Sequence, residues 1–212
     1  MLQLDHITIL APSLPEGVAH VRDCLDIDVP FGRQHQDMGT HNHLLRLGDA
    51  LYLEIIAINP GAPRPGRPRW FGLDDQPAVR AAWDDGRRLR GWVARTTDID
   101  GALAGHEAIL GRKVRLTSGD AVFFFAIPED GALPMAGAAP SVIDRQGRPP
   151  PVAAMADFGA TLQSLVIEHP QPAQIRALYD ALDIDTPPTV RAGGQLRYLA
   201  SIGTPRGIRQ LF

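Results

Sequence analysis

Apolar and polar residues alternate along residues 2–10, where the sequence reads LQLDHITIL. A period of two is typical of a strand with one covered face, and it puts His6 on one face and Asp5 on the other. A second apolar run, at residues 50–58, contains Glu54 as its only charged residue. Each of the two predicted strands therefore contains an ionisable residue, His6 or Glu54, that is unusual in a hydrophobic core.

The segment between these two strands predicts a helix and further strands. Ser13 is suited to cap a helix that runs to about Leu25. We interpret residues 34–40 as a polar loop, and Gly48-Asp49 as the turn of a hairpin. The first 58 residues therefore read as one strand, one helix and three strands, expected near residues 29–31, at 42–47 and at 50–58.

The composition changes at residues 59–69, which read NPGAPRPGRPR and are too rich in Pro and Gly for a helix or a central strand. We predict a surface connector there. Further along we expect helices at residues 77–85, 98–111 and 172–182, and strands at 91–96, 113–116, 121–127, 140–144, 162–170, 190–191 and 195–202.

An internal repeat organises the chain. Residues 4–28 are similar to residues 162–185, and both segments end in Leu-Asp-Ile-Asp, at Leu25 to Asp28 and Leu182 to Asp185. Duplication of a strand–helix–strands module explains this pattern better than chance. We predict one compact unit made of a first module (1–58), a connector and helix (59–89), a second and divergent module (90–150) and a third module (160–212).

Composition narrows the classes of function. The chain has 212 residues, 44% of them hydrophobic, and a net charge of −3, which is ordinary for a globular protein and argues against a nucleic-acid partner. No apolar run is long enough to span a membrane. The first residues alternate like a strand and lack a basic leader region, so we expect no signal peptide and a cytoplasmic location. The single cysteine, Cys24, excludes an internal disulfide.

Several short motifs point to one family. They are Leu4-Asp5-His6, Gly39-Thr40, Asn42, Arg46, Gly48, Tyr52-Leu53-Glu54, Gly91-Trp92, Thr97-Asp98-Ile99-Asp100, Leu133-Pro134 and the segment from Leu165 to His169-Pro170. In this combination the sequence resembles the vicinal oxygen chelate superfamily, and more narrowly its glyoxalase-like domain proteins. The resemblance spans nearly the whole chain.

The resemblance implies an α+β fold of repeated βαβββ modules whose mixed sheets curl into a cup. It also implies that, in metal-dependent members, each of two modules gives one ligand from its first strand and one from its last. The first module supplies His6 and Glu54. The matching positions in the second module are near Gly91 and at Ile143 or Asp144, and those in the third are Ser164 and Gln210.

Three interpretations of His6 and Glu54 remain open. They could bind a divalent ion such as Zn, Mn, Fe or Ni, with a third ligand from His35, His41, His43 or Asp144. They could instead act without a metal, because a desolvated carboxylate has a raised pKa and can abstract a proton next to a carbonyl group. In the third interpretation His6 is a hydrogen-bonded histidine of the cup wall and Glu54 is its partner.

Other residues are candidates for substrate contacts. By the period of two, Asn42 and Arg46 share a strand face, and the resemblance favours their pointing into the cup, where Arg46 could clamp a carboxylate. Trp70 and Trp92 could line the mouth of the pocket.

We therefore expect an enzyme of the lyase, isomerase or dioxygenase type that acts on a small carbonyl compound or oxyacid at His6 and Glu54. The alternative is a non-catalytic protein that binds and sequesters small molecules such as drugs. In either case we expect a homodimer, because modules of this kind often pair through sheet edges.

Overall fold

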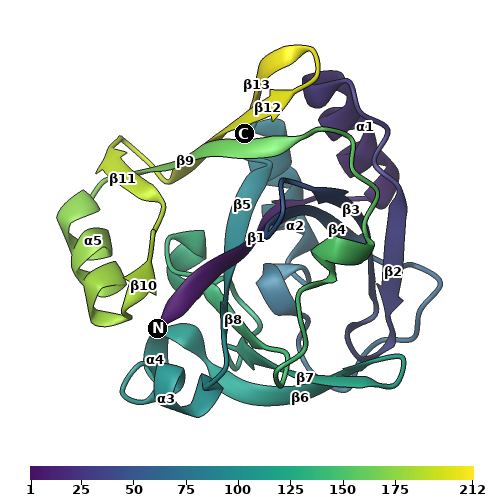
Figure 1. Cartoon of the computed structure of the whole chain (residues 1–212). Helices are drawn as coiled ribbons and strands as arrows, with labels where there is room; N and C mark the ends of the chain where they lie inside the picture. The colour runs from purple at the N-terminus through teal and green to yellow at the C-terminus, as the bar shows by residue number, and fades with distance from the viewer.

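The computed structural model describes residues 1–212, which form two β-sheets with short helices around them (Figure 1). The strands are β1 (Leu2–Leu10), β2 (Phe31–His35), β3 (Thr40–Arg46), β4 (Tyr52–Ile58), β5 (Leu89–Thr96), β6 (Arg112–Ser118), β7 (Ala121–Ile127), β8 (Ser141–Asp144), β9 (Thr161–His169), β10 (Ile184–Asp185), β11 (Thr189–Ala192), β12 (Arg197–Thr204) and β13 (Gly207–Leu211). The helices are α1 (Leu14–Leu25), α2 (Gln76–Asp84), α3 (Ile99–Leu103), α4 (Glu107–Leu110) and α5 (Pro172–Ala181), with 3₁₀ helices η1 (Gln36–Met38), η2 (Trp70–Gly72), η3 (Pro134–Gly137) and η4 (Pro151–Ala154).

The large sheet has the strand order β2-β3-β4-β1-β5-β8-β7-β6, and β10 also pairs with β1. Its two central strands, β1 and β5, are antiparallel, whereas β1 and β4 are parallel. Each half of the sheet therefore has its long first strand at the centre and its hairpin at the outside (Figure 1).

The two edges of the large sheet come together because the sheet curls. The Arg33 guanidinium on β2 donates to Ser118 Oγ at the end of β6, at 2.8 Å. The Asp37 carboxylate on η1 accepts from both the backbone N–H and the hydroxyl of Thr117, at 2.7 and 2.8 Å. We call this contact, made by Arg33, Asp37, Thr117 and Ser118, the edge seam.

The third module forms a sheet of its own, in the order β11-β9-β12-β13. In the first module the last strand, β4, lies beside the first strand, but here the last strand lies beyond β12 at the edge. Gln210 on β13 is therefore two strands from Ser164 on β9 and contacts Ser201 instead. The proposed match of Gln210 to Glu54 is wrong, because the strand order of the third module differs.

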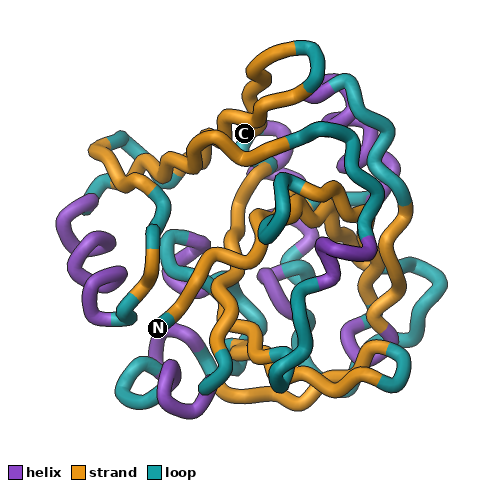
Figure 2. Tube along the Cα trace, viewed as in Figure 1, coloured by secondary structure: helices purple, strands orange, loops and turns teal.

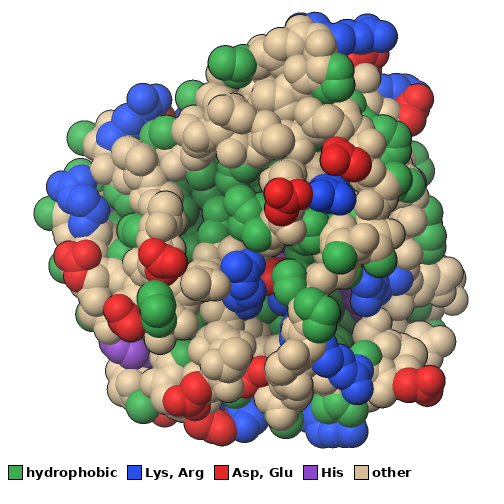
Figure 3. Space-filling model, in the orientation of Figure 1, with side chains coloured by type: hydrophobic (Ala, Val, Ile, Leu, Met, Phe, Trp, Pro, Cys, Tyr) green, Lys and Arg blue, Asp and Glu red, His purple; other side chains and the backbone are tan.

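The two faces of the large sheet contribute to different cores. One face packs with α1, α5 and the small sheet in a cluster of 35 buried hydrophobic residues. The other face, inside the curl, holds a cluster of 13 buried hydrophobic residues that includes Trp70, Phe71 and Phe125. Figure 3 also shows hydrophobic side chains gathered in a hollow of the surface beneath β9, next to the small sheet.

Most predicted elements are present. Ser13 caps α1, and Asp26 ends it with a left-handed backbone (φ 58°), as Asp183 does after α5 (φ 50°), so the repeat extends to the helix ends. Two of the predicted elements differ from the structure. The polar loop at 34–40 is partly strand, because β2 continues to His35. The helix predicted for 98–111 is broken into α3 and α4.

A β-bulge changes the face on which Asp5 lies. Leu4 pairs with Ala94 and His6 pairs with Val93, so Asp5 is an extra residue on β1. A bulge interrupts the strict alternation of side chains. The Asp5 side chain consequently lies beside that of His6, which corrects the prediction that the two point to opposite faces.

The segment from residue 145 to residue 160 leads from β8 to β9 and passes across the curled sheet (Figure 2). Pro149, Pro150 and Pro151 lie in it, which suits an extended connection. No helix of the structure is both long and apolar enough to cross a membrane.

Candidate functional site

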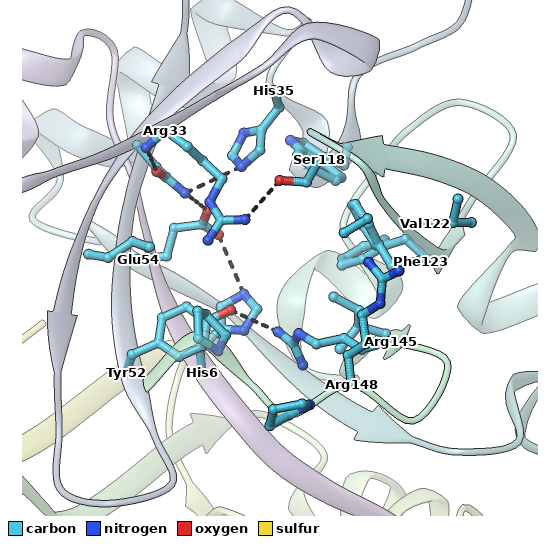
Figure 4. Close-up of a pocket in the computed structure, with 18 of the residues that line it drawn as sticks. His6, Arg33, His35, Tyr52, Glu54, Ser118, Val122, Phe123, Arg145 and Arg148 are labelled. Atoms are coloured by element: carbon cyan, nitrogen blue, oxygen red, sulfur yellow. Dashed lines mark hydrogen bonds and ion pairs between the residues drawn. The ribbon is translucent and has the colours of Figure 1, made fainter. Parts of the chain in front are cut away.

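A cavity of about 190 Å³ lies inside the curl of the large sheet (Figure 4). Strands β1 to β4 form one wall, with His6, Asn42 and Glu54. Strands β7 and β8 form the facing wall, which is apolar at Phe123, Phe125 and Ile143. No residue of the third module lines this cavity, which the first and second modules form together with Trp70 and Phe71 of the connector.

The centre of the site is a row of three ionisable side chains. His6 Nδ1 lies 2.6 Å from Asp5 Oδ1, and His6 Nε2 lies 3.4 Å from Glu54 Oε2. All three residues are buried, with 0% of Asp5, 4% of His6 and 6% of Glu54 exposed. Asp5 and Glu54 thus hold both ring nitrogens of His6, which fixes the orientation of the imidazole.

Asn42 continues this row on the side of β3. Its Nδ2 donates to Glu54 Oε1 at 2.6 Å and lies 3.4 Å from His35 Nε2, and its Oδ1 accepts the backbone N–H of Arg33. The other ring nitrogen of His35 contacts the hydroxyl of Thr40 at 2.9 Å. Every polar atom of the Asn42 amide therefore has a partner, and Glu54 is held from both sides.

Arg145 closes the other end of the row. Its guanidinium binds both oxygens of Asp5, at 2.5 and 2.8 Å, and donates to Tyr52 Oη at 3.0 Å. The Tyr52 ring stacks on the imidazole of His6, with 4.4 Å between ring centroids. Figure 4 shows Arg145 reaching toward Tyr52 and His6 from the segment after β8. A bidentate pair of this kind fixes geometry as well as charge.

The environment favours the charged form of each member of the row. Burial would lower the pKa of His6, but the carboxylates of Asp5 and Glu54 outweigh it and raise that pKa. Burial would raise the pKa of Glu54, but the hydrogen bond and charge of His6 and the hydrogen bond from Asn42 outweigh it and lower that pKa. The prediction of a raised pKa for Glu54 is therefore wrong, because its neighbours stabilise the carboxylate more than burial destabilises it.

His35 behaves in the opposite way. Burial is the largest cause of its shift, and with the positive charges of Arg33, His6 and His41 it outweighs the attraction of Glu54 and lowers the pKa of His35 to about 4. His35 is therefore neutral at neutral pH. A neutral ring accepts from Asn42 and donates to Thr40, in agreement with the two contacts described above.

The side chains of the site do not make up a metal centre. Nowhere in the chain do three or more His, Cys, Asp or Glu side chains come together in a way that could hold a metal ion. Ile143 on the facing wall offers no donor atom. Catalytic zinc sites use three protein ligands, so the donor set does not fit one.

The other candidate ligands have structural roles or lie elsewhere. His43 Nδ1 donates to the backbone carbonyl of Val29 at 2.6 Å, and neither His41 nor His43 lines the cavity. Asp144 is buried and accepts the backbone N–H of Gln146 at 2.8 Å. The remaining candidate, His35, lines the cavity, but its two ring nitrogens contact Thr40 and Asn42, so no third ligand is free beside His6 and Glu54.

Two of the four predicted substrate contacts line the cavity. Asn42 and Trp70 do, whereas Arg46 binds Asp49 and the backbone of Gly48 outside it. Trp92 lies on the opposite face of the sheet, where it contacts Tyr179. The expectation that Arg46 and Trp92 face the cup is corrected: Arg46 is at the end of β3, and Trp92 pairs with Ile7, which points into the larger core.

Tyr52, Arg33, Arg145 and Arg148 are among the cavity residues that were missed from the sequence. Tyr52 could have been found, because it shares a strand face with Glu54 by the period of two. Arg33 lies between the strand expected near residues 29–31 and the loop expected at 34–40, and Arg145 and Arg148 lie on an irregular segment. No local pattern indicates where such arginines point.

Comparisons with known proteins agree with this architecture. A family model described as a glyoxalase-like domain matches residues 4–182. A hypothetical protein from Staphylococcus aureus has a similar structure, with a TM-score of 0.58 and 12% sequence identity over 100% of this chain and 99% of that chain.

Two more distant similarities are to methylmalonyl-CoA epimerases. One is a variant from Streptomyces coelicolor in complex with 2-nitronate-propionyl-CoA, with a TM-score of 0.40 and 19% identity over 68% of this chain and 98% of that one. The other, from Mycobacterium tuberculosis, has a TM-score of 0.40 and 19% identity over 72% of this chain and 91% of that one. No curated protein matches the sequence. At these identities the structural similarities bear on the fold alone.

Proposed function

Because this chain belongs to the glyoxalase-like domain family of the vicinal oxygen chelate superfamily, with the α+β fold of curled sheets expected from its sequence, we propose that it is an enzyme. It acts on a small carbonyl compound or oxyacid in the cavity of the large sheet. Glu54 is the general base, and His6 holds a proton beside the Glu54 carboxylate.

One observation carries this proposal: Glu54 is a buried, ionised carboxylate that lines a cavity and is held by Asn42 and His6. Proton transfer needs a base at a fixed position in the correct protonation state. The lowered pKa of Glu54 keeps it ionised at neutral pH, and the raised pKa of His6 keeps a proton beside it.

The chemistry follows from these positions. The Glu54 carboxylate takes a proton from the carbon next to the substrate carbonyl, and the electron pair of that C–H bond moves into an enolate. The negative charge then develops on the carbonyl oxygen, where a cavity arginine such as Arg33 stabilises it. Return of the proton to the carbon gives an isomerase, and loss of a neighbouring group gives a lyase.

An isomerase or lyase fits these residues better than a dioxygenase does. Acid–base chemistry needs only the side chains described, whereas a dioxygenase of this superfamily needs more metal ligands than His6 and Glu54 supply. We therefore assign no metal-dependent step.

A non-catalytic binding protein is the second candidate. The observation that favours it is the apolar facing wall, where Phe123, Phe125 and Ile143 offer no second acid or base. Such a wall suits the capture of a small hydrophobic compound.

We also propose a homodimer. Strand β13 is the outer strand of the small sheet, and its Ile208 is 70% exposed. An exposed edge strand can pair with another chain. Sedimentation equilibrium tests this, and a monomer at micromolar concentration would contradict it.

Proton–deuterium exchange tests the proposed function. The protein is incubated in D₂O with a panel of small 2-oxo acids and malonate-type acids, and NMR follows loss of the proton next to the carbonyl. We expect exchange above the buffer rate for at least one acid and a fall of about 100-fold or more in Glu54→Gln. Arg67→Gln, at an exposed position outside the cavity, is the control with wild-type exchange.

Acids that bind saturably while all of them exchange at the buffer rate would overturn the enzyme proposal and support the binding protein. Equal exchange in wild type and Glu54→Gln would show that Glu54 is not the base.

A further inference from the structure

The charges that line the cavity do not balance. Arg145 is paired with Asp5, and His6 is paired with Glu54, so these four groups cancel. Arg33 and Arg148 also line the cavity, and neither forms an ion pair with a carboxylate. The cavity therefore carries two positive charges in excess, which favours a ligand with negative charge.

The first of these arginines, Arg33, is held in place. Its Nη1 donates to Ser118 Oγ at 2.8 Å, and its backbone N–H donates to Asn42 Oδ1 at 2.9 Å. A neutral hydroxyl satisfies one of five guanidinium N–H groups and none of the charge. Arg33 is thus an oriented cation on the β2 side of the cavity with donors to spare.

The second arginine, Arg148, lies on the segment between β8 and β9. It is exposed, and its guanidinium makes no hydrogen bond within the chain. Figure 4 shows Arg33 and Arg148 on opposite sides of the cavity, with Arg148 near Phe123. The two cations consequently cannot be regarded as one cluster.

The groups between the two arginines restrict the ligand further. Glu54 lies next to the Arg33 side, and the facing wall is apolar at Phe123 and Phe125. The cavity of about 190 Å³ is smaller than the roughly 300–1,000 Å³ of sites for drug-sized ligands. The ligand is therefore small, anionic at both ends and apolar along one side.

We propose that the substrate class is a short dicarboxylate that bridges Arg33 and Arg148, with its middle carbons beside Glu54. This inference rests on the proposed function, since it names the substrate class of the same site. Guanidinium groups bind carboxylates through paired hydrogen bonds, so each end of such an acid has a matching partner.

Calorimetric titration tests the proposal with four dicarboxylates, malonate, succinate, glutarate and adipate, and with butyrate as a monocarboxylate of similar size. We expect at least one dicarboxylate to bind about tenfold or more tightly than butyrate at the same ionic strength. Arg33→Gln and Arg148→Gln should each lower the affinity for that dicarboxylate about tenfold or more. In at least one of these two variants, the affinity for butyrate should fall less than the affinity for the dicarboxylate.

A control variant separates the cavity charges from charge elsewhere. Arg67→Gln removes a positive charge at an exposed position outside the cavity and should bind the dicarboxylate like the wild type. Thermal unfolding of every variant verifies that the fold is retained.

The proposal is overturned if butyrate binds as tightly as every dicarboxylate, or if Arg67→Gln weakens binding as much as Arg33→Gln. Failure of the proposed function gives a different result. Selective dicarboxylate binding without proton exchange would refute the enzyme proposal and support the dicarboxylate site. Exchange on neutral or singly charged compounds alone would support the enzyme proposal and refute the dicarboxylate site.

Discussion

Asp5 and His6 are consecutive residues of one strand, yet Asp5 Oδ1 lies 2.6 Å from His6 Nδ1. Consecutive strand residues normally point to opposite faces, and the bulge at Asp5 removes that separation. The imidazole of His6 therefore has a carboxylate at each ring nitrogen, Asp5 at Nδ1 and Glu54 at Nε2.

The first prediction concerns the protonation of His6. We expect its imidazole to titrate above the ordinary pKa of 6.5 in an NMR pH titration. In Asp5→Asn the pKa should fall relative to the wild type, because the nearest negative charge is gone. Asp28→Asn, which removes an exposed carboxylate that does not line the cavity, should leave the titration unchanged.

This shift also predicts how stability depends on pH. Because folding raises the pKa of His6, the resulting stabilisation is fully present below pH 6.5 and is lost as the pH rises through the folded value. Urea unfolding of wild type and His6→Gln between pH 6 and 9 measures this loss. A wild type that gains stability relative to the variant as the pH rises would contradict the assignment.

The second prediction concerns Arg145. Replacing it with Gln leaves the fully buried Asp5 carboxylate without its bidentate partner, and we expect the free energy of unfolding to fall by about 3 kcal/mol. The control is Arg191→Gln, whose ion pair with Glu168 is exposed and should contribute less than about 1 kcal/mol. Equal losses of unfolding free energy in the two variants would show that the buried Arg145–Asp5 pair stabilises the fold no more than an exposed ion pair does.

The third prediction is a loss of stability in acid that depends on His35. Its pKa is about 4 in the folded protein and about 6.5 when unfolded. Between these values the unfolded chain binds the extra proton, so the wild type loses stability as the pH falls from 6.5 toward 4. Urea unfolding at pH 7, 6 and 5 should show a shallower decline in His35→Gln. A decline that is the same in both proteins would refute this role.

The fourth prediction compares two glycines with left-handed backbones. A Cβ at Gly111 (φ +87°) would lie 2.1 Å from backbone atoms of Ile127 and Pro128, whereas one at Gly105 (φ +76°) would meet nothing within 4 Å. Gly105→Ala should cost about 1 kcal/mol from backbone strain alone. Gly111→Ala should cost about 3 kcal/mol or more, because backbone must also move. Chemical denaturation of both variants measures the difference.

The fifth prediction follows from the donor set of the cavity. With only His6 and Glu54 as candidate ligands, we expect Zn²⁺ or Mn²⁺ to raise the unfolding temperature of wild type and His6→Ala by the same small amount. A large increase that only the wild type shows would demonstrate a metal site at His6.

The family resemblance, and not alternation alone, indicated His6 and Glu54 as a pair, and in the structure both line the cavity from strands that pair directly. Asp5 was assigned to the wrong face because a bulge depends on the partner strand and has no mark in its own sequence. Trp92 was also assigned to the wrong face of the sheet. Alternation groups residues by face but does not say which face lines the cup.

Other parts of the site depend on contacts between distant segments. Arg145 is 140 residues from Asp5, and no local pattern predicts that pair. Gln210 was matched to Glu54 by its position in a repeat. The small sheet orders its strands differently from the first module, so equal positions in the repeated sequence do not give equal positions in space.

The edge seam has a consequence for access to the cavity. Its hydrogen bonds join η1 and β2 to β6, segments about 80 residues apart in sequence, and two of them lie at an exposed position. Few bonds need to break for the seam to part, while the central strands stay paired. The amide of Thr117 should then exchange with solvent faster than the amides of β1, so hydrogen exchange at that amide would measure how often the cup opens.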